Sequence, residues 1–187
     1  MKCFAPALFS FTLLPLAASA SQTIPVGPFQ SVELHGGGHV TLRHGDSQRV
    51  TLIAGNTQCT DIHIESGGRL VIAAHNRGCP GRYDLDVEVV TPNIEGVAIS
   101  GGGEIETASG FGAQPMLSAA ISGGGDIDVR SVEASTVHAA VSGGGDVRVR
   151  AQKALTAAVN GGGSITYWGH PNVTSAVNGG GSVERGG

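Results

Sequence analysis

Residues 119–127 read Ala-Ala-Ile-Ser-Gly-Gly-Gly-Asp-Ile, and four near-copies of this block stand elsewhere in the second half of the chain. The triple glycines of the five blocks start at Gly101, Gly123, Gly143, Gly161 and Gly179. The number of residues from one triplet to the next decreases slightly toward the C-terminus. Repetition at about 20 residues is typical of proteins built from stacked structural units, each of which packs only on its neighbours.

When the blocks are aligned on their glycines, apolar residues recur at every second position, which is the signature of a β-strand. Each repeat would then consist of a strand, a tight glycine corner and a second strand. The β-branched or Leu residues that share one parity are expected to point inward, and they are Ile99, Leu117, Ile121, Val137, Val141, Leu155, Val159, Val173 and Val177 before the corners, and Ile105, Ile127, Val147, Ile165 and Val183 after them.

The repeats predict an all-β protein, a right-handed parallel β-helix (a solenoid) with about 18–22 residues per turn. Small residues between the apolar positions and an aromatic content of only 4% favour a narrow interior. Upstream, glycine-rich segments at 35–39 and 66–68 look like corners of the same kind. The segments between such turns predict a less regular β portion, with strands at residues 31–35, 39–43, 49–54, 61–65, 69–74 and 84–91.

The first twenty residues have the features of a cleavable signal peptide. Lys2 precedes an apolar stretch that ends in an Ala-Ser-Ala cleavage site at residues 18–20. We expect residues 1–20 to be removed on export to the periplasm or the cell exterior, and no other stretch is long and apolar enough to cross a membrane. The remainder, residues 21–187, is predicted to be a single domain, irregular over 21–92 and regular over 93–187.

The charge and the cysteines narrow the class of protein further. The chain has 11 Lys and Arg residues against 15 Asp and Glu residues, for a net charge of −4. This balance argues against a nucleic-acid-binding protein, which requires a basic surface. Cys59 and Cys79 are the two cysteines that remain after export. An even pair in an oxidising compartment predicts a disulfide, which would close a loop of about 20 residues.

Several segments resemble one known family. Residues 90–101 (Val-Thr-Pro-Asn-Ile-Glu-Gly-Val-Ala-Ile-Ser-Gly), the Ser-Gly-Gly-Gly-Asp blocks and residues 27–32, 40–46 and 167–173 are similar to the family called "putative autotransporter adhesin, head GIN domain". The resemblance covers nearly all of residues 27–183. It implies a parallel β-helix in a bacterial envelope protein, and it brings no catalytic residues with it.

Two sets of side chains invite a metal. Just after the corners stand Glu104, Asp126 and Asp146, which would form an acidic ladder on adjacent strands, either a calcium site or a solvated row in which Asp128 pairs with Arg148. The histidines, His35, His39, His44, His63, His75, His138 and His170, show no spacing typical of a metal motif. We therefore predict no metal and no cofactor.

An outward face of small, uncharged residues favours docking of another flat surface. Its members are Ala120, Ala140, Ala158 and Ala176, flanked by His138, Thr156 and Thr174. The predicted function is a non-catalytic envelope module for adhesion, protein interaction or scaffolding, with an envelope protein, a surface glycan or a second copy as partner. The alternative is a small β-helix polysaccharide lyase or hydrolase, or a calcium-dependent glycan binder, that uses the ladder of Glu104, Asp126 and Asp146.

Overall fold

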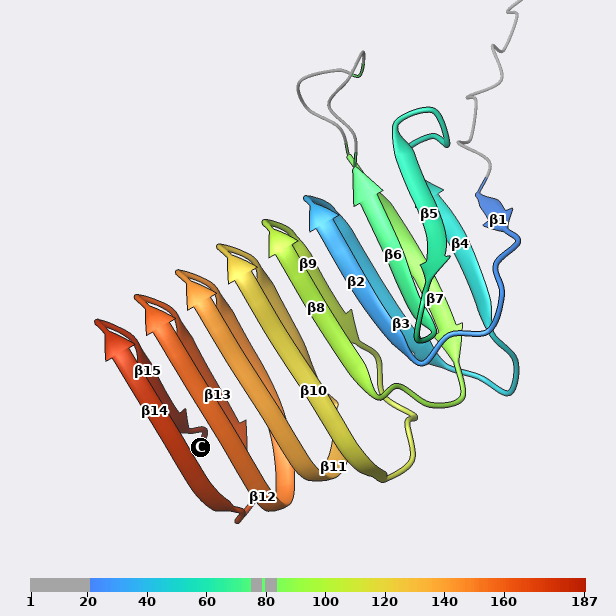
Figure 1. Ribbon diagram of the computed structural model, residues 1–187. Coiled ribbons are helices and arrows are strands. Elements are labelled where there is room, and N and C mark those ends of the chain that lie inside the picture. Colours follow the sequence, from blue (N-terminus) through green and yellow to red (C-terminus); the bar gives the residue numbers. More distant parts are fainter. Residues whose placement is uncertain (1–20, 75–78, 80–83) are drawn as a thin grey trace, which may run out of the picture.

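The computed structural model describes residues 21–74, 79 and 84–187, so the predicted signal peptide, residues 1–20, lies outside the described residues. Fifteen strands join into one sheet (Figure 1). None of the described residues belongs to a helix with the length and apolarity that a membrane crossing needs.

The strands upstream of the glycine repeats lie close to their predicted positions. They are β1 (Gln22–Ile24), β2 (Ser31–Gly36), β3 (His39–His44), β4 (Arg49–Ala54), β5 (Thr60–Glu65), β6 (Arg69–Ala74) and β7 (Asp86–Thr91). The repeats contribute β8 (Gly96–Gly101), β9 (Glu104–Thr107), β10 (Gln114–Gly123), β11 (Asp126–Gly143), β12 (Asp146–Gly161), β13 (Ser164–Trp168), β14 (Asn172–Gly179) and β15 (Ser182–Arg185).

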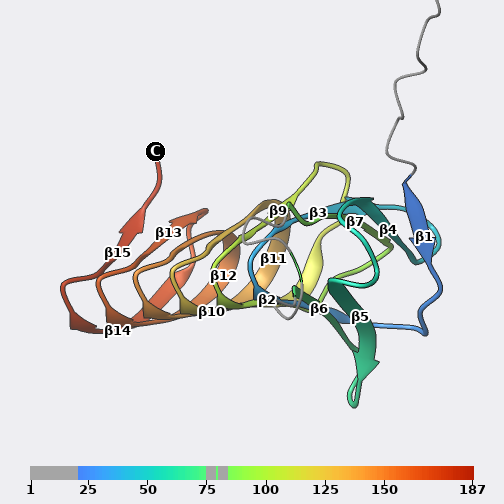
Figure 2. The same ribbon diagram turned by 90° about the horizontal axis from the view of Figure 1, so that it is seen from above.

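The sheet folds over into two layers that enclose one core (Figure 2). One layer runs through β5, β6, β2, β8 and β10, and the other through β1, β4, β7, β3 and β9. The long strands β11 and β12 belong to both layers, because each begins after one corner and continues to the next. Beyond them, β14 extends the first layer and β13 and β15 extend the second.

The structure corrects the predicted fold class. The all-β prediction is confirmed, but the sheet is mixed and curls into a nearly closed, flattened barrel, so the prediction of a right-handed parallel β-helix is wrong. The repeats do pair in parallel, as β10 does with β11 and β11 with β12. The pairs β1–β4, β4–β7 and β5–β6, however, are antiparallel.

The antiparallel strands follow from turns whose geometry differs from that of the repeat corners. Residues 66–68 are predicted to be a corner, yet Gly67 and Gly68 adopt φ values of +85° and +70°. Two consecutive left-handed residues reverse the chain in a tight hairpin, and β5 and β6 therefore run in opposite directions. The loop between β3 and β4 likewise brings β4 back antiparallel to β7.

The glycine corners stack directly on one another. Gly123 pairs with Gly101 on one side and with Gly143 on the other, and the amide of Gly144 donates a hydrogen bond of 2.9 Å to the carbonyl oxygen of Gly123. Gly123 has φ +134°, and a Cβ added to it would lie 2.1 Å from the carbonyl oxygen of Gly101. The corner thus requires glycine both for its dihedral angle and for the closeness of its neighbour.

The predicted inward residues form the core, except in the last repeat. Ile105, Ile127, Val147 and Ile165 are fully buried. In β14, by contrast, Val173 and Val177 are 39% and 42% exposed, although the residues beside them in β12 are buried. The last repeat therefore keeps the apolar identity of an interior repeat at an open edge of the sheet.

The corner geometry makes a sharp prediction about two adjacent glycines. Gly143→Ala should lower the free energy of unfolding by about 3 kcal/mol, because Gly143 has φ +133° and a Cβ there would lie 2.1 Å from the oxygen of Gly123. Gly144→Ala should be nearly neutral, since nothing lies within 4 Å of a Cβ at that position. Urea denaturation of both variants measures this difference, and equal losses would contradict the account of the corner.

The disulfide predicted between Cys59 and Cys79 is present, and it closes a loop of 20 residues. Restricting the unfolded chain over such a loop is worth about 3 kcal/mol. The variant with both Cys59→Ser and Cys79→Ser should therefore unfold about 6–12 °C below the wild-type protein. Thermal unfolding followed by circular dichroism checks this value, and wild-type protein in reducing agent should match the double variant.

Candidate functional site

Each corner sends the chain from one layer of the sheet to the other, so the repeats present two opposite outer faces (Figure 2). We call the outer surface of β8, β10, β14 and the C-terminal halves of β11 and β12 the alanine face. The outer surface of β3, β9, β13 and the N-terminal halves of β11 and β12 is called the acidic face. The sequence-predicted site residues divide between these two surfaces.

The alanine face takes its name from a row of alanines on neighbouring strands. Ala98, Ala120, Ala140, Ala158 and Ala176 stand side by side in parallel register. A second row, also in register, runs beside them and consists of Ser118, His138, Thr156 and Thr174. The structure thus brings together all seven residues predicted for an interaction face: Ala120, Ala140, Ala158, Ala176, His138, Thr156 and Thr174.

A third row on the alanine face consists of Ser100, Ser122, Ser142, Asn160 and Asn178. The Asn178 amide donates a hydrogen bond of 3.2 Å to the Asn160 side-chain oxygen, so polar groups in this row link adjacent repeats. None of the three rows contains Asp, Glu, Lys or Arg. The face is therefore flat and uncharged from β8 to β14.

The alanine face is hollowed beside the β5–β6 hairpin. A shallow groove of about 300 Å³ lies there, lined by Ser31, Gly67, Glu95, Ala98 and Ala120 among others. Gly67 belongs to the turn between β5 and β6, so the hairpin borders the groove. The groove gives the otherwise flat surface one recess of the size of a small side chain or sugar ring.

The acidic face carries the predicted ladder. Asp126 lies between Glu104 and Asp146 in parallel register, so the three carboxylates stand on adjacent strands as expected. The row continues on one side to Ser164, whose hydroxyl donates a hydrogen bond to Asp146. On the other side it continues through His39, which is paired in register with both Glu104 and Asp86.

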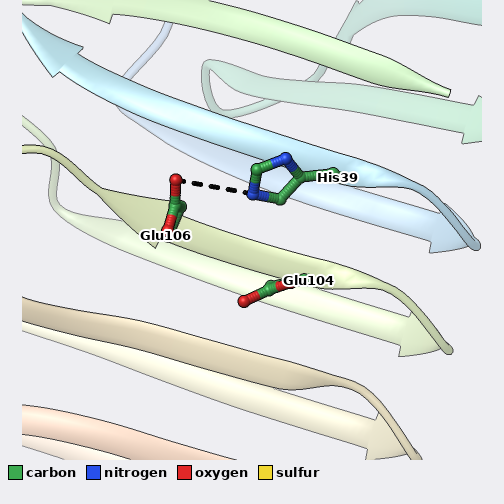
Figure 3. Close-up of side chains that lie close together, drawn as sticks. All are labelled: His39, Glu104 and Glu106. Atoms are coloured by element: carbon green, nitrogen blue, oxygen red, sulfur yellow. Dashed lines mark ion pairs between the residues drawn. The ribbon is translucent and has the colours of Figure 1, made fainter.

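His39, Glu104 and Glu106 form a cluster that was not among the predicted sites (Figure 3), although aligning the glycines at 36–38 with those at 101–103 would have placed His39 beside Glu104. One ligand atom from each of the three side chains lies within 4.8 Å of the others. The Nε2 atom of His39 is 3.5 Å from a carboxylate oxygen of Glu106. His39 and Glu104 are far apart in the chain, and only the pairing of β3 with β9 brings them together.

Beside this cluster lies a second polar group, in a groove of about 390 Å³. Arg130 binds Asp128 through a 2.6 Å ion pair and stacks 4.7 Å above the centre of the Trp168 ring. The prediction that Asp128 forms its ion pair with Arg148 is therefore wrong, because the partner is Arg130. Arg148 lies beside Asp128 on the adjacent strand, but the guanidinium of Arg130, two residues further along the same strand, donates the hydrogen bonds to the Asp128 carboxylate.

The environment of Asp128 shifts its acidity. Partial burial raises the pKa of the Asp128 carboxyl, but hydrogen bonds from Arg130 and the charges of Arg130 and Arg148 outweigh this, and the pKa lies below its ordinary value. A carboxyl whose pKa is lowered by folding stabilises the fold above its ordinary pKa of about 3.9. That stabilisation is lost as the pH falls through the lowered value.

We therefore predict an acid-sensitive contribution from this pair. Between about pH 5 and about pH 2, wild-type protein should lose up to about 0.5 kcal/mol more of its free energy of unfolding than Asp128→Asn, a small value because the pair is only partly buried and solvent screens it. Urea denaturation at a series of pH values measures the difference. Asp46→Asn, in an exposed loop, controls for the change in net charge, and identical acid limbs for Asp128→Asn and wild type would contradict the prediction.

One family of known proteins accounts for most of the sequence. The family described as "Putative auto-transporter adhesin, head GIN domain" matches residues 28–115 and 107–171. The chain belongs to this family. Membership in the head GIN family indicates an adhesin-like protein of the bacterial envelope or exterior. No curated protein matches the chain.

Solved structures of two bacterial proteins are similar to this head GIN domain. A "putative adhesin" from Bacteroides fragilis is 14% identical and superposes with a TM-score of 0.50, covering 89% of this chain and 96% of the other. A "putative adhesin" from Parabacteroides merdae is 16% identical with a TM-score of 0.36, covering 90% and 96% of the two chains. The match to the B. fragilis protein supports the all-β fold of the head GIN domain and the correction to its predicted class.

Proposed function

We propose that residues 21–187 are an exported, non-catalytic adhesion module that binds a protein or glycan of the cell surface through the alanine face. In this proposal the chain is released from a signal peptide at residues 1–20 and acts in the periplasm or outside the cell. Membership of the head GIN family supports a role in surface interaction. The alanine face supplies a surface suited to that role.

The observation that carries the proposal is the flatness of the alanine face over five repeats. Ala98, Ala120, Ala140, Ala158 and Ala176 are exposed or half-buried, and methyl groups in register leave no long side chain to be ordered or displaced when a partner docks. Binding costs include the loss of side-chain freedom at the interface. A surface of short side chains avoids most of that cost and permits close approach.

The polar rows beside the alanines would supply specificity. Hydroxyl groups of Thr156 and Thr174 and the amides of Asn160 and Asn178 are exposed and spaced by the separation of adjacent strands. A partner with a repeating pattern of hydrogen-bond donors and acceptors, such as a polysaccharide or an extended peptide, matches such a spacing. The groove beside Gly67 would hold one protruding group of that partner.

Lysine substitutions on the alanine face test the proposal. In the double variant Ala140→Lys, Ala158→Lys, two long cations would stand in the centre of the face, and burying them against a partner costs several kcal/mol. Binding to the producing bacterium's isolated envelope fraction, measured by biolayer interferometry with immobilised residues 21–187, should weaken at least about tenfold.

A matched control carries the same two added charges elsewhere. Ser109→Lys, Ala113→Lys places them in the exposed loop before β10, outside the three rows of the alanine face. This variant should bind like the wild type, and both variants should keep the wild-type melting temperature. Equal binding by all three proteins would remove the alanine face from the interaction, and equal loss in both variants would show that charge rather than position matters.

A further inference from the structure

We infer that His39, Glu104 and Glu106 bind a divalent transition-metal ion of the Zn²⁺ class on the acidic face (Figure 3). This site lies in the layer opposite the alanine face, and the inference does not depend on the proposed function.

The three side chains converge because of the register of two strands. His39 in β3 pairs directly with Glu104 in β9, and Glu106 lies two residues further along β9, on the same side of the sheet. One donor atom of each side chain already lies within 4.8 Å of the other two. Zinc ligands at about 2.0–2.2 Å from the ion stand roughly 3.3 Å apart, so rotamer adjustments of about 1 Å would complete the coordination.

The backbone that carries these ligands is fixed on both sides of the corner. The His39 amide donates a hydrogen bond of 2.8 Å to the Leu85 carbonyl oxygen, and the Glu104 amide donates one of 2.9 Å to the Gly38 carbonyl oxygen. Gly38 has φ +125°, and a Cβ there would lie 2.9 Å from Leu85. The ligands therefore start from rigid strand ends rather than from a loop, which reduces the ordering that metal binding would require.

A second observation comes from the other ring nitrogen of His39. Its Nδ1 atom lies 3.7 Å from a carboxylate oxygen of Asp86, while Nε2 faces Glu106 at 3.5 Å. Histidines that bind metals through one ring nitrogen usually present the other to a carboxylate, which orients the ring and strengthens its donor character. Asp86 in β7 occupies that supporting position, and the cluster consists of three ligands and one carboxylate behind the imidazole.

The local charge also favours a cation. Some carboxylates elsewhere on the described surface have arginine partners, as Glu33 does in Arg69, Glu88 in Arg43 and Asp128 in Arg130. Among the described residues no ion pair is formed by Glu104 or by the adjacent Asp126, and Glu106 is paired only with His39. Arg130 and Arg150 line the groove that Glu106 borders, but neither forms an ion pair with the cluster, and a divalent ion would supply a positive charge bound directly to its carboxylates.

The ligand set selects the kind of metal. Calcium prefers six to eight oxygen ligands, whereas an imidazole nitrogen with carboxylates suits zinc and its neighbours in the first transition row. The site therefore differs from the calcium ladder expected from Glu104, Asp126 and Asp146, since it shares only Glu104 with it. Three protein ligands leave one position for water or for a donor atom of a bound molecule.

Isothermal titration calorimetry of residues 21–187, freed of metal by a chelator, tests the site with ZnCl₂ as the probe. Wild-type protein should bind one ion with a dissociation constant in the micromolar range. His39→Ala and Glu106→Gln should each weaken binding at least tenfold, whereas His138→Ala, which removes an exposed histidine from the alanine face, should leave it unchanged. A crystal soaked in ZnCl₂ and measured at the zinc absorption edge should show the ion between His39 and the two glutamates.

The competing outcomes are distinct. No zinc binding by the wild type, or equal affinity in wild type and His39→Ala, overturns the inference. Binding of CaCl₂ that exceeds that of ZnCl₂ and is lost in Asp146→Asn overturns it as well, in favour of the ladder. The Ala140→Lys, Ala158→Lys variant should retain zinc, so failure of the metal site and failure of the alanine face are told apart.

Discussion

The stacking of glycine corners is the constraint on which the rest of this structure depends. At each corner a backbone carbonyl of one repeat accepts a hydrogen bond from the amide of the next, and no side chain fits between them. Because the side-chain period of a strand is two, a register error of one residue would exchange the core for the surface. The corners oppose this error, since a shift of one residue would place a residue with a side chain against a corner glycine of the next repeat, where the first and third positions leave no room for a Cβ.

Both candidate surfaces follow from this fixed register. It places equivalent positions of successive repeats side by side. A residue type that recurs at one position of the repeat therefore forms a continuous row across the strands. The alanine face arises from one small residue before each corner, and the ladder of Glu104, Asp126 and Asp146 from one acid after it. The zinc cluster arises differently, where the row of acids reaches the irregular strand β3 and meets His39.

The sequence predicts well what the repeat encodes locally. The alternation that predicts Ile105, Ile127, Val147 and Ile165 as core residues is confirmed by their complete burial, and the predicted strand at residues 49–54 coincides with β4. The direction of strands in the irregular part was not predicted, because the Gly67–Gly68 pair resembles a corner in sequence but places two consecutive residues at positive φ. The pairing of β3 with β9 could have been predicted, since aligning the glycines at 36–38 with those at 101–103 sets His39 beside Glu104. The ion-pair partner of Asp128 is Arg130 and not Arg148, which is adjacent to Asp128 in register. The sequence places both arginines near Asp128 and does not show which of them forms the pair.

The open edge at β14 makes the domain extensible. Val173 and Val177 of β14 are exposed apolar residues at the positions that Leu155 and Val159 occupy in β12. The corner at Gly179 likewise repeats the corner at Gly161. The step from Gly143 to Gly161 and the step from Gly161 to Gly179 are equal in length. A duplication or deletion of one such unit would therefore join compatible surfaces and leave every other register intact. Such a change would lengthen or shorten both outer faces by one row of residues and leave the irregular end, with the disulfide and His39, as it is.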